Sequence, residues 1–271
     1  MRIKVATHSG FCFGVKRAIN IAEKNLADPR YKNKIYSLGA IIHNPQVVDD
    51  LSKKGLKVIK DISSAKKGAV IISSHGAPIE TIEKIKAMGL KLIDASCPFV
   101  KYAHDIVKRL KREGYRVLII GDKKHPEVKA LLSLAGKGGN KAKIGVVSQT
   151  TQNKGNYIKE VLDILKEDFK EVRVFNTICN DTSRRQTLAR RLLKDRDVVI
   201  VVGGRNSANT KRLWQICKES GASSFHIETP GELKKSYFRG KSRAGIVSGA
   251  STPDSMVKKV AQKIKNLTKE G

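Results

Sequence analysis

Short apolar runs alternate with stretches of helical periodicity along the whole chain. The runs that predict strands are Ile3–Thr7, Lys34–Leu38, Leu56–Ile59, Ala69–Ser73, Lys91–Asp94, Arg116–Ile120, Lys143–Ser148, Val172–Asn176, Asp197–Val202, Ser224–Ile227 and Ala244–Ser248. Several runs are apolar at successive positions, which is typical of parallel strands that are covered on both faces. Because helical stretches separate the runs, the pattern predicts an α/β fold with mainly parallel sheets.

Caps and prolines predict where several helices begin. Pro45 follows the cap residue Asn44, and Pro98 predicts a second helix start. Ser183 and Gln186 have the spacing of a capping box and predict a third start at Ser183. Each of these positions precedes a stretch whose apolar residues recur at helical spacing.

A strand runs into a cysteine three times along the chain. The cysteines are Cys12, Cys97 and Cys179, they recur at similar intervals, and a helical stretch follows each. Ligands of parallel sheets bind beyond the carboxyl ends of the strands, so these positions suit a binding site. The spacing is compatible with three similar units that each donate one cysteine.

Three chemistries are open for these cysteines on the residues alone. Distant thiolates can hold an iron–sulfur cluster or another metal, although no C-x-x-C pattern is present. Structural zinc normally needs a fourth ligand. Buried, inert thiols are the third alternative. The remaining cysteine, Cys217, lies on an apolar helical stripe and is predicted to belong to the core.

The charge balance is strongly basic and raises a second functional class. The chain carries 54 Lys and Arg against 25 Asp and Glu, a formal net charge of +29. A lysine-rich solvated surface explains this charge, and so does nucleic-acid binding. Aromatic residues make up 5% of the chain and are not interleaved with the cations, which is poor support for base stacking.

Composition also predicts the compartment. No apolar run is long enough to span a bilayer, and the first residues reach Thr7 and His8 too soon for a signal peptide. Four cysteines without an export signal indicate a reducing compartment. We therefore expect a cytoplasmic protein that does not interact with membranes.

Nine segments in a fixed order resemble one enzyme family. They are His8–Val15, Ile42–Pro45, Ser74–Gly76, Asp94–Pro98, His125–Val128, Ser148–Gln152, Thr177–Cys179, Asn206–Thr210 and Gly249–Asp254. Together they are similar to the 4-hydroxy-3-methylbut-2-enyl diphosphate reductases, iron–sulfur enzymes that end the non-mevalonate route to isoprenoids. The match covers essentially the whole chain.

The resemblance implies a fold and a cofactor. It implies three α/β lobes around a central cluster, here residues 14–97, 98–175, and 1–13 with 176–271. It also implies that Cys12, Cys97 and Cys179 hold one 4Fe–4S cluster whose open apical iron faces the substrate.

The resemblance further implies the reaction and its residues. The reaction is reductive dehydroxylation of the hydroxylated allylic diphosphate to isopentenyl and dimethylallyl diphosphate, with ferredoxin or flavodoxin as the electron donor. Glu127, Thr150 and His125 would be catalytic. The residues expected to bind the substrate are His43, His75, His125, Thr150, Ser207, Ala208, Asn209 and Ser251. The alternatives from other classes are a basic nucleic-acid-binding α/β protein and a non-catalytic module structured by zinc.

Asp181 departs from the family pattern at a position close to Cys179, an expected cluster ligand. Asp181 follows Cys179 closely, where many family members have a neutral residue. A carboxylate that points toward the cluster would make it harder to reduce. Replacing Asp181 by alanine would then change the reduction potential.

Overall fold

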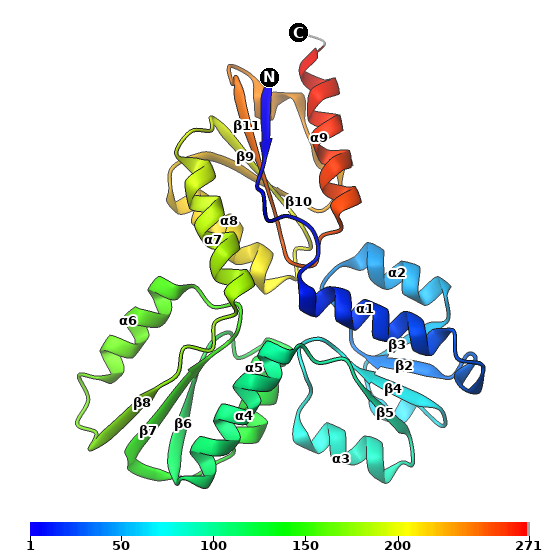
Figure 1. Ribbon diagram of the computed structural model, residues 1–271, viewed down its shortest axis with the longest axis vertical. Helices are drawn as coiled ribbons and strands as arrows, with labels where there is room; N and C mark the ends of the chain where they lie inside the picture. The colour runs from blue at the N-terminus through cyan, green and yellow to red at the C-terminus, as the bar shows by residue number, and fades with distance from the viewer. Residues whose placement is uncertain (270–271) are drawn as a thin grey trace. The chain divides into compact units, whose positions relative to one another are not determined.

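The computed structural model of the chain describes residues 1–269, and its strands form three separate parallel sheets (Figure 1). The strand orders are β1-β11-β9-β10, β3-β2-β4-β5 and β6-β7-β8. Every neighbouring pair is parallel, which confirms the predicted α/β class. Among the described residues, no helix combines the length and the apolar character needed to cross a membrane.

The strands lie where the apolar runs predict them, with ends that differ by a few residues. Their bounds are β1 (Arg2–Val5), β2 (Ile35–Leu38), β3 (Leu56–Ile59), β4 (Ala69–Ile72), β5 (Lys91–Asp94), β6 (Tyr115–Ile120), β7 (Asn140–Ser148), β8 (Glu171–Val174), β9 (Val198–Val202), β10 (Ser223–Ile227) and β11 (Arg243–Ser248). The largest difference is β7, which begins at Asn140, before the first apolar residue of its run.

The α-helices fill the intervals between the strands. Their bounds are α1 (Phe13–Leu26), α2 (Pro45–Lys53), α3 (Ile79–Ala87), α4 (Pro98–Arg112), α5 (Pro126–Ala135), α6 (Lys154–Ile164), α7 (Asn180–Leu193), α8 (Ala208–Glu219) and α9 (Asp254–Lys269). The predicted starts at Pro45 and Pro98 are confirmed. The predicted start at Ser183 is wrong, because α7 already begins at Asn180. An ion pair between Asp181 and Arg185, one turn apart, stabilises the earlier turn.

The described chain divides into two compact units. The smaller unit contains Met1–Cys12, His43–Pro45 and the chain from Asn180 onward, with the sheet β1-β11-β9-β10. The larger unit contains Phe13–Ile42 and Gln46–Cys179, with the other two sheets. The three predicted lobes each correspond in range to one sheet, and their boundaries stay a prediction.

Successive side chains of β9 point to opposite faces of the sheet, which explains why helices lie on both faces in the smaller unit. Val198, Ile200 and Val202 pack with residues of α9, whereas Val199 and Val201 pack with residues of α7 and α8. The helices accordingly cover both faces of this sheet (Figure 1). Cys217 of α8 is fully buried in the second cluster, which confirms its predicted place in the core.

The two sheets of the larger unit follow the same rule. In β4, Val70 and Ile72 pack against Ile85 of α3. In β7, Val147 packs with residues of α4 and α5, and Val146 packs with Tyr157 of α6. Strand β7 is therefore covered on two faces, and all four residues of β4 are buried, as the continuous apolar runs of both strands predict.

Nine of the eleven strands lead at their carboxyl ends into the candidate residues. In chain order the pairs are β1 with Cys12, β2 with His43, β4 with His75, β5 with Cys97, β6 with His125 and Glu127, β7 with Thr150, β8 with Cys179, β9 with Ser207, Ala208 and Asn209, and β11 with Ser251. This is the edge at which open parallel sheets bind ligands.

Candidate active site

In the larger unit, Glu127 and Thr150 form a closely coupled pair. Glu127 lies in the first turn of α5, and its side chain is 1% exposed. The Thr150 backbone N–H donates to one carboxyl oxygen of Glu127 at 2.6 Å, and the Thr150 hydroxyl donates to the other at 2.9 Å. Both residues follow the carboxyl ends of adjacent strands, β6 and β7, so the sheet brings them together.

Burial changes the acidity of this pair. Loss of water around the carboxylate raises the pKa of Glu127 from 4.5 to about 7, and the two hydrogen bonds from Thr150 oppose that rise. A carboxyl group with this pKa can hold and release a proton near neutral pH.

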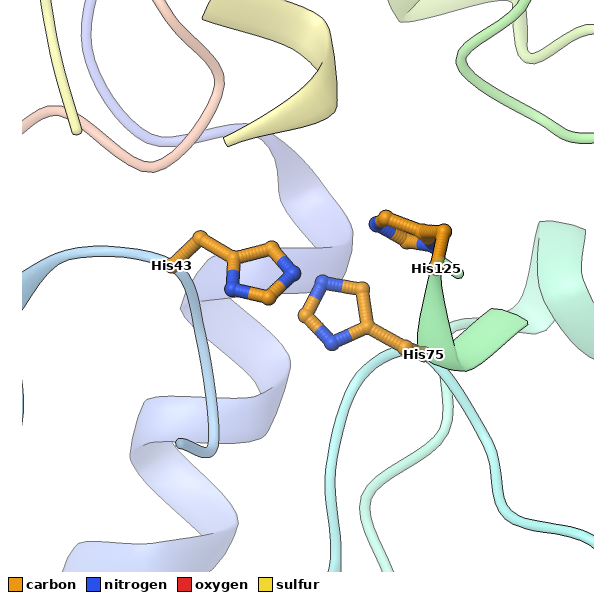
Figure 2. Close-up of side chains that lie close together, drawn as sticks. All are labelled: His43, His75 and His125. Carbon is orange, nitrogen blue, oxygen red and sulfur yellow. The ribbon is translucent and has the colours of Figure 1, made fainter. Parts of the chain in front are cut away.

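His125 caps helix α5 and stands next to His75. Its Nδ1 accepts a hydrogen bond of 3.2 Å from the Glu127 backbone N–H. Nδ1 is therefore the unprotonated nitrogen, and Nε2 carries the proton. The rings of His75 and His125 are perpendicular, with centroids 5.2 Å apart (Figure 2). Both imidazoles thus belong to one cluster of the larger unit.

Cys97 and Cys179, the two candidate ligands of the larger unit, each immediately precede a helix. Cys97 is the N-cap of α4, and Cys179 is followed by the first residue of α7. The Cys97 backbone N–H donates to the Ser74 carbonyl at 3.0 Å, and the Cys179 N–H donates to the Thr150 carbonyl at 2.9 Å. Thr150 therefore connects the backbone of one cysteine to the carboxyl group of Glu127.

The electrostatics at Cys97 combine opposing effects. Burial raises the pKa of the Cys97 thiol, and the Glu127 charge acts in the same direction. Backbone N–H groups of Phe99 and Val100 lower it, as the amino end of a helix does for a thiolate. The Arg17 guanidinium also lowers it, and this side chain donates to the carbonyl of Ser96 at 2.9 Å.

Cys12, the candidate ligand of the smaller unit, has the same local setting. It immediately precedes the first residue of α1, and its backbone N–H donates to the Ala250 carbonyl at 2.9 Å. The loop after β11 therefore holds the loop that carries Cys12. None of the four cysteines forms a disulfide bond within residues 1–269.

The smaller unit also gathers the polar residues expected at a phosphate. The amino end of α8 carries Ser207 as its cap and Asn209 in its first turn. Asn209 is 4% exposed, and neither polar atom of its side chain has a hydrogen-bond partner within residues 1–269. The Ser251 hydroxyl donates to the His43 carbonyl at 3.1 Å. Burial, with the nearby charge of Lys211, lowers the pKa of His43.

Ala208 contributes no polar side-chain atom to this group. It is the first residue of α8, where backbone N–H groups lack helical partners. An unpartnered, buried amide beside such N–H groups is suited to an anionic ligand.

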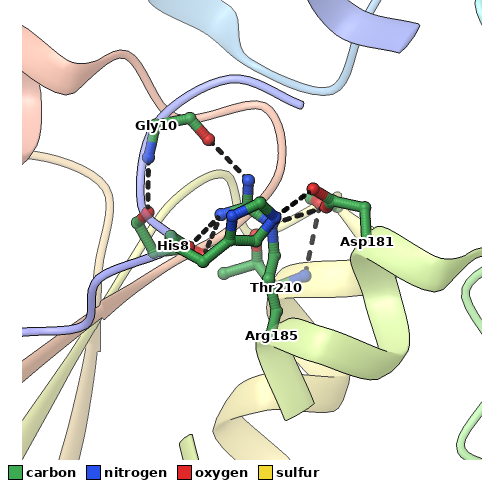
Figure 3. A network of polar contacts seen from close by, with 7 residues as sticks. His8, Gly10, Asp181, Arg185 and Thr210 are labelled. Atoms are coloured by element: carbon green, nitrogen blue, oxygen red, sulfur yellow. Dashed lines mark hydrogen bonds and ion pairs between the residues drawn. The ribbon is translucent and has the colours of Figure 1, made fainter. Parts of the chain in front are cut away.

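Arg185, which no pattern in the sequence singles out, is the central residue of a network in the smaller unit. Its guanidinium pairs with Asp181 at 2.6 Å, and His8 contacts the other oxygen of that carboxylate at 2.6 Å (Figure 3). Asp181 is therefore engaged by two partners. Its effect on the reduction potential of a cluster stays a prediction.

Comparison with known proteins places these observations in a family. A family model described as "LytB protein" matches residues 3–265. A 4-hydroxy-3-methylbut-2-enyl diphosphate reductase from Aquifex aeolicus is 44% identical, over 98% of this chain and 96% of the relative. The enzyme of the same name from Syntrophotalea carbinolica is also 44% identical, over 99% of this chain and all of the relative.

Solved structures agree with the sequence comparison. One structure, of (E)-4-hydroxy-3-methyl-but-2-enyl diphosphate reductase, the terminal enzyme of the non-mevalonate pathway, has a TM-score of 0.70 and 44% identity and covers 98% of this chain and 100% of that chain. Another, of E-1-hydroxy-2-methyl-but-2-enyl-4-diphosphate reductase from Plasmodium falciparum, has a TM-score of 0.89 and 28% identity and covers 96% and 87%. The resemblance of the nine segments is thereby confirmed, and the chain belongs to the LytB protein family of reductases.

Proposed function

We propose that this chain removes the hydroxyl group of (E)-4-hydroxy-3-methylbut-2-enyl diphosphate reductively and forms isopentenyl and dimethylallyl diphosphate. The substrate takes up two electrons and two protons, and one water leaves. Full-length similarity to reductases of this name favours this activity over nucleic-acid binding or a zinc-structured module. The observation that carries the proposal is the buried Glu127 carboxyl group, whose pKa of about 7 suits a proton donor.

We assign the metal ligands to Cys12, Cys97 and Cys179. Their chemistry fits an iron–sulfur cluster, because each is a cysteine outside any disulfide bond that directly precedes the first residue of a helix. Cys12, Cys97 and Cys179 would hold a 4Fe–4S cluster with an open apical iron, and this group would supply electrons to the substrate one at a time.

Glu127 and Thr150 would deliver the proton that lets water leave. When Glu127 is protonated at the oxygen that contacts the Thr150 hydroxyl, it can donate across that 2.9 Å contact. The Thr150 hydroxyl can then donate its own hydrogen to the leaving oxygen. The backbone N–H of Thr150 fixes the other carboxyl oxygen, so the proton has one defined exit.

The diphosphate would be bound by imidazole, hydroxyl and amide groups. We assign this role to His43, His75, His125, Ser207, Asn209 and Ser251, with Thr150 near the reacting end and the backbone N–H of Ala208 as a further donor. The amino end of α8 adds the positive end of a helix dipole. The protonated Nε2 of His125 would donate to the substrate while its Nδ1 remains occupied.

The charge and the cysteines support our assignment of an electron donor and a compartment. Ferredoxins and flavodoxins are generally acidic one-electron carriers, and a net charge of +29 would accelerate their encounter with this chain. Four cysteines that form no disulfide bond in the described part of the chain agree with a reducing cytoplasm.

Anaerobic reconstitution with iron and sulfide tests the activity and the ligands together. We expect a brown protein with about four irons per chain that converts the hydroxylated allylic diphosphate when a strong reductant is present. Replacing Cys12, Cys97 or Cys179 by alanine should abolish cluster binding. The matched control is Cys217→Ala, which changes a core cysteine and should retain the cluster. A colourless protein that binds zinc would overturn the proposal.

A further inference from the structure

Arg185 is a buried cation whose side chain makes several contacts in the smaller unit. Its side chain is 2% exposed. Its Nε donates to the Asp181 carboxylate at 2.6 Å, and its two terminal nitrogens donate to backbone carbonyls of three other residues (Figure 3). Four of the five N–H groups of a guanidinium are thus in use.

The three carbonyls belong to the two loops that follow β1 and β11. One terminal nitrogen of Arg185 donates to the carbonyls of His8 and Ser248, both at 3.1 Å. The other donates to the carbonyl of Gly10 at 2.9 Å. Cys12 lies two residues beyond Gly10, and Ser251 lies three residues beyond Ser248. One side chain therefore holds the loop of a proposed cluster ligand and the loop of a proposed substrate ligand.

Gly10 is fixed on its other sides as well. Its N–H donates to the Ser248 hydroxyl at 3.2 Å. Its φ of +85° lies in the left-handed region, and a Cβ there would overlap the Asp254 carboxylate. The loop before Cys12 is thus held at Gly10 by Ser248 and by the Arg185 guanidinium, and the Asp254 carboxylate leaves no room for a side chain there.

The ion pair connects this loop to a second cysteine through the chain. Asp181, which Arg185 binds, is two residues after Cys179. His8, which binds the same carboxylate, is four residues before Cys12. A buried ion pair is an inefficient way to gain stability, because desolvation offsets much of the attraction. What the pair supplies more effectively than an apolar contact is a fixed geometry.

We propose that Arg185 is a positioning residue that fixes the Cys12 loop and the start of α7, and so presets two cluster ligands before the metal binds. This inference rests on the proposed function, because it takes Cys12 and Cys179 as ligands. Arg185 donates to the Asp181 carboxylate and to three backbone carbonyls, so its effect is exerted through backbone position and through the charge of Asp181.

Hydrogen exchange on the metal-free protein tests the positioning without any cofactor. The reporters are the amides of Gly10 and Cys12, which bond to Ser248 and Ala250, and the reference is the Ala6 amide in the strand ladder. In Arg185→Met, we expect the two loop amides to exchange at least roughly 10-fold faster, because several hydrogen bonds to a charged group are lost. The Ala6 amide should change far less.

Two further variants make this experiment specific. Arg184→Met is the matched control, because Arg184 is the exposed neighbour on the same helix. It should leave both loop amides as they are. Arg185→Lys keeps the charge but cannot reach three carbonyls and a carboxylate at once, so it should resemble Arg185→Met. Equal acceleration of the loop amides and of Ala6 would show a general structural role and would overturn the inference.

The reconstituted protein supplies a second, independent readout. We expect Arg185→Met to release iron to a chelator faster than the parent and to have a lower reduction potential, since Asp181 is left without its cation. Asp181→Asn should shift the potential upward, and the double variant should return toward the parent value. Unchanged iron release and potential in Arg185→Met would overturn the inference. Failure of the parent to bind a cluster would instead overturn the proposed function, while the exchange result would stand.

Discussion

Individual residues determine the acid–base chemistry of this chain. Glu127 is buried, yet its carboxylate accepts two hydrogen bonds, both donated by Thr150. Without these donors, burial would raise the pKa of Glu127 further than about 7. The pair therefore sets the proton affinity of the candidate acid within the range where it can work at neutral pH.

Glu127→Gln separates catalysis from stability. A glutamine can accept from the Thr150 N–H and donate to its hydroxyl oxygen, so the fold should persist while kcat falls by about 10²–10⁴-fold. Because the folded pKa exceeds the unfolded value of 4.5, the parent loses stability as pH rises from about 4.5 to 7. The variant should become the more stable protein across this window, by up to about 3 kcal/mol. Denaturant unfolding of both metal-free proteins measures the difference, and a constant difference over pH would contradict the assignment.

Thr150→Val tests the hydroxyl contact. The change removes one donor to the carboxylate, so the pKa of Glu127 should rise further and the alkaline loss of activity should move to higher pH. We also expect kcat to fall by about 10-fold or more, because the relay is lost. Thr151→Val is the control, since the Thr151 hydroxyl has no hydrogen-bond partner in the described part of the chain. The measurement is the pH profile of kcat, and identical profiles for the two variants would refute the relay.

Among the secondary-structure elements, the amino ends of the helices hold most of the candidate functional residues. Cys12, Cys97 and Cys179 each stand directly before a helix, and His125 and Ser207 are the caps of α5 and α8. A residue at such a position can contribute to two properties. It can cap a helix, which affects stability, and it lies beyond the carboxyl end of a strand, where ligands bind.

Variants of His125 separate its role as a helix cap from its role in binding substrate. In His125→Asn the amide oxygen can replace Nδ1 as the cap, so stability should stay near that of the parent. In His125→Ala the cap is lost, at a cost of about 1 kcal/mol. Both variants lose the Nε2 donor, so both should show a similarly reduced turnover. Thermal unfolding and steady-state kinetics of the pair decide the matter. If the asparagine variant were as unstable as the alanine variant, His125 would not act as a cap.

Elements were more predictable from sequence than the contacts between them. The apolar runs predicted the strands because covered strands must be apolar on both faces, and the prolines marked α2 and α4. The capping-box spacing of Ser183 and Gln186 predicted the wrong start for α7. That spacing involves two neighbouring residues, whereas the observed start at Asn180 is stabilised by the ion pair between Asp181 and Arg185. Arg185 itself was missed because three of its acceptors are backbone carbonyls distant in the chain, which leave no side-chain signature.

For the whole molecule, the net charge of +29 governs encounters with other proteins. Turnover with an acidic ferredoxin or flavodoxin should fall steeply as salt rises, because screening removes the attraction. Turnover with a small uncharged reductant should change little. Comparing the two donors over the same salt series measures the effect, and equal sensitivity would rule out electrostatic attraction of the donor.

The order of the strands has a consequence for biosynthesis. Strand β1 lies at the edge of its sheet beside β11, and the Cys12 N–H donates to the Ala250 carbonyl, so the start of the chain finds these partners near the end. The strands of both other sheets lie between residues 35 and 174 and can pair earlier on the ribosome. Cys12 therefore has no fixed position until translation passes residue 250. We expect nascent chains halted before that point to acquire no stable cluster, even where iron and sulfide are plentiful.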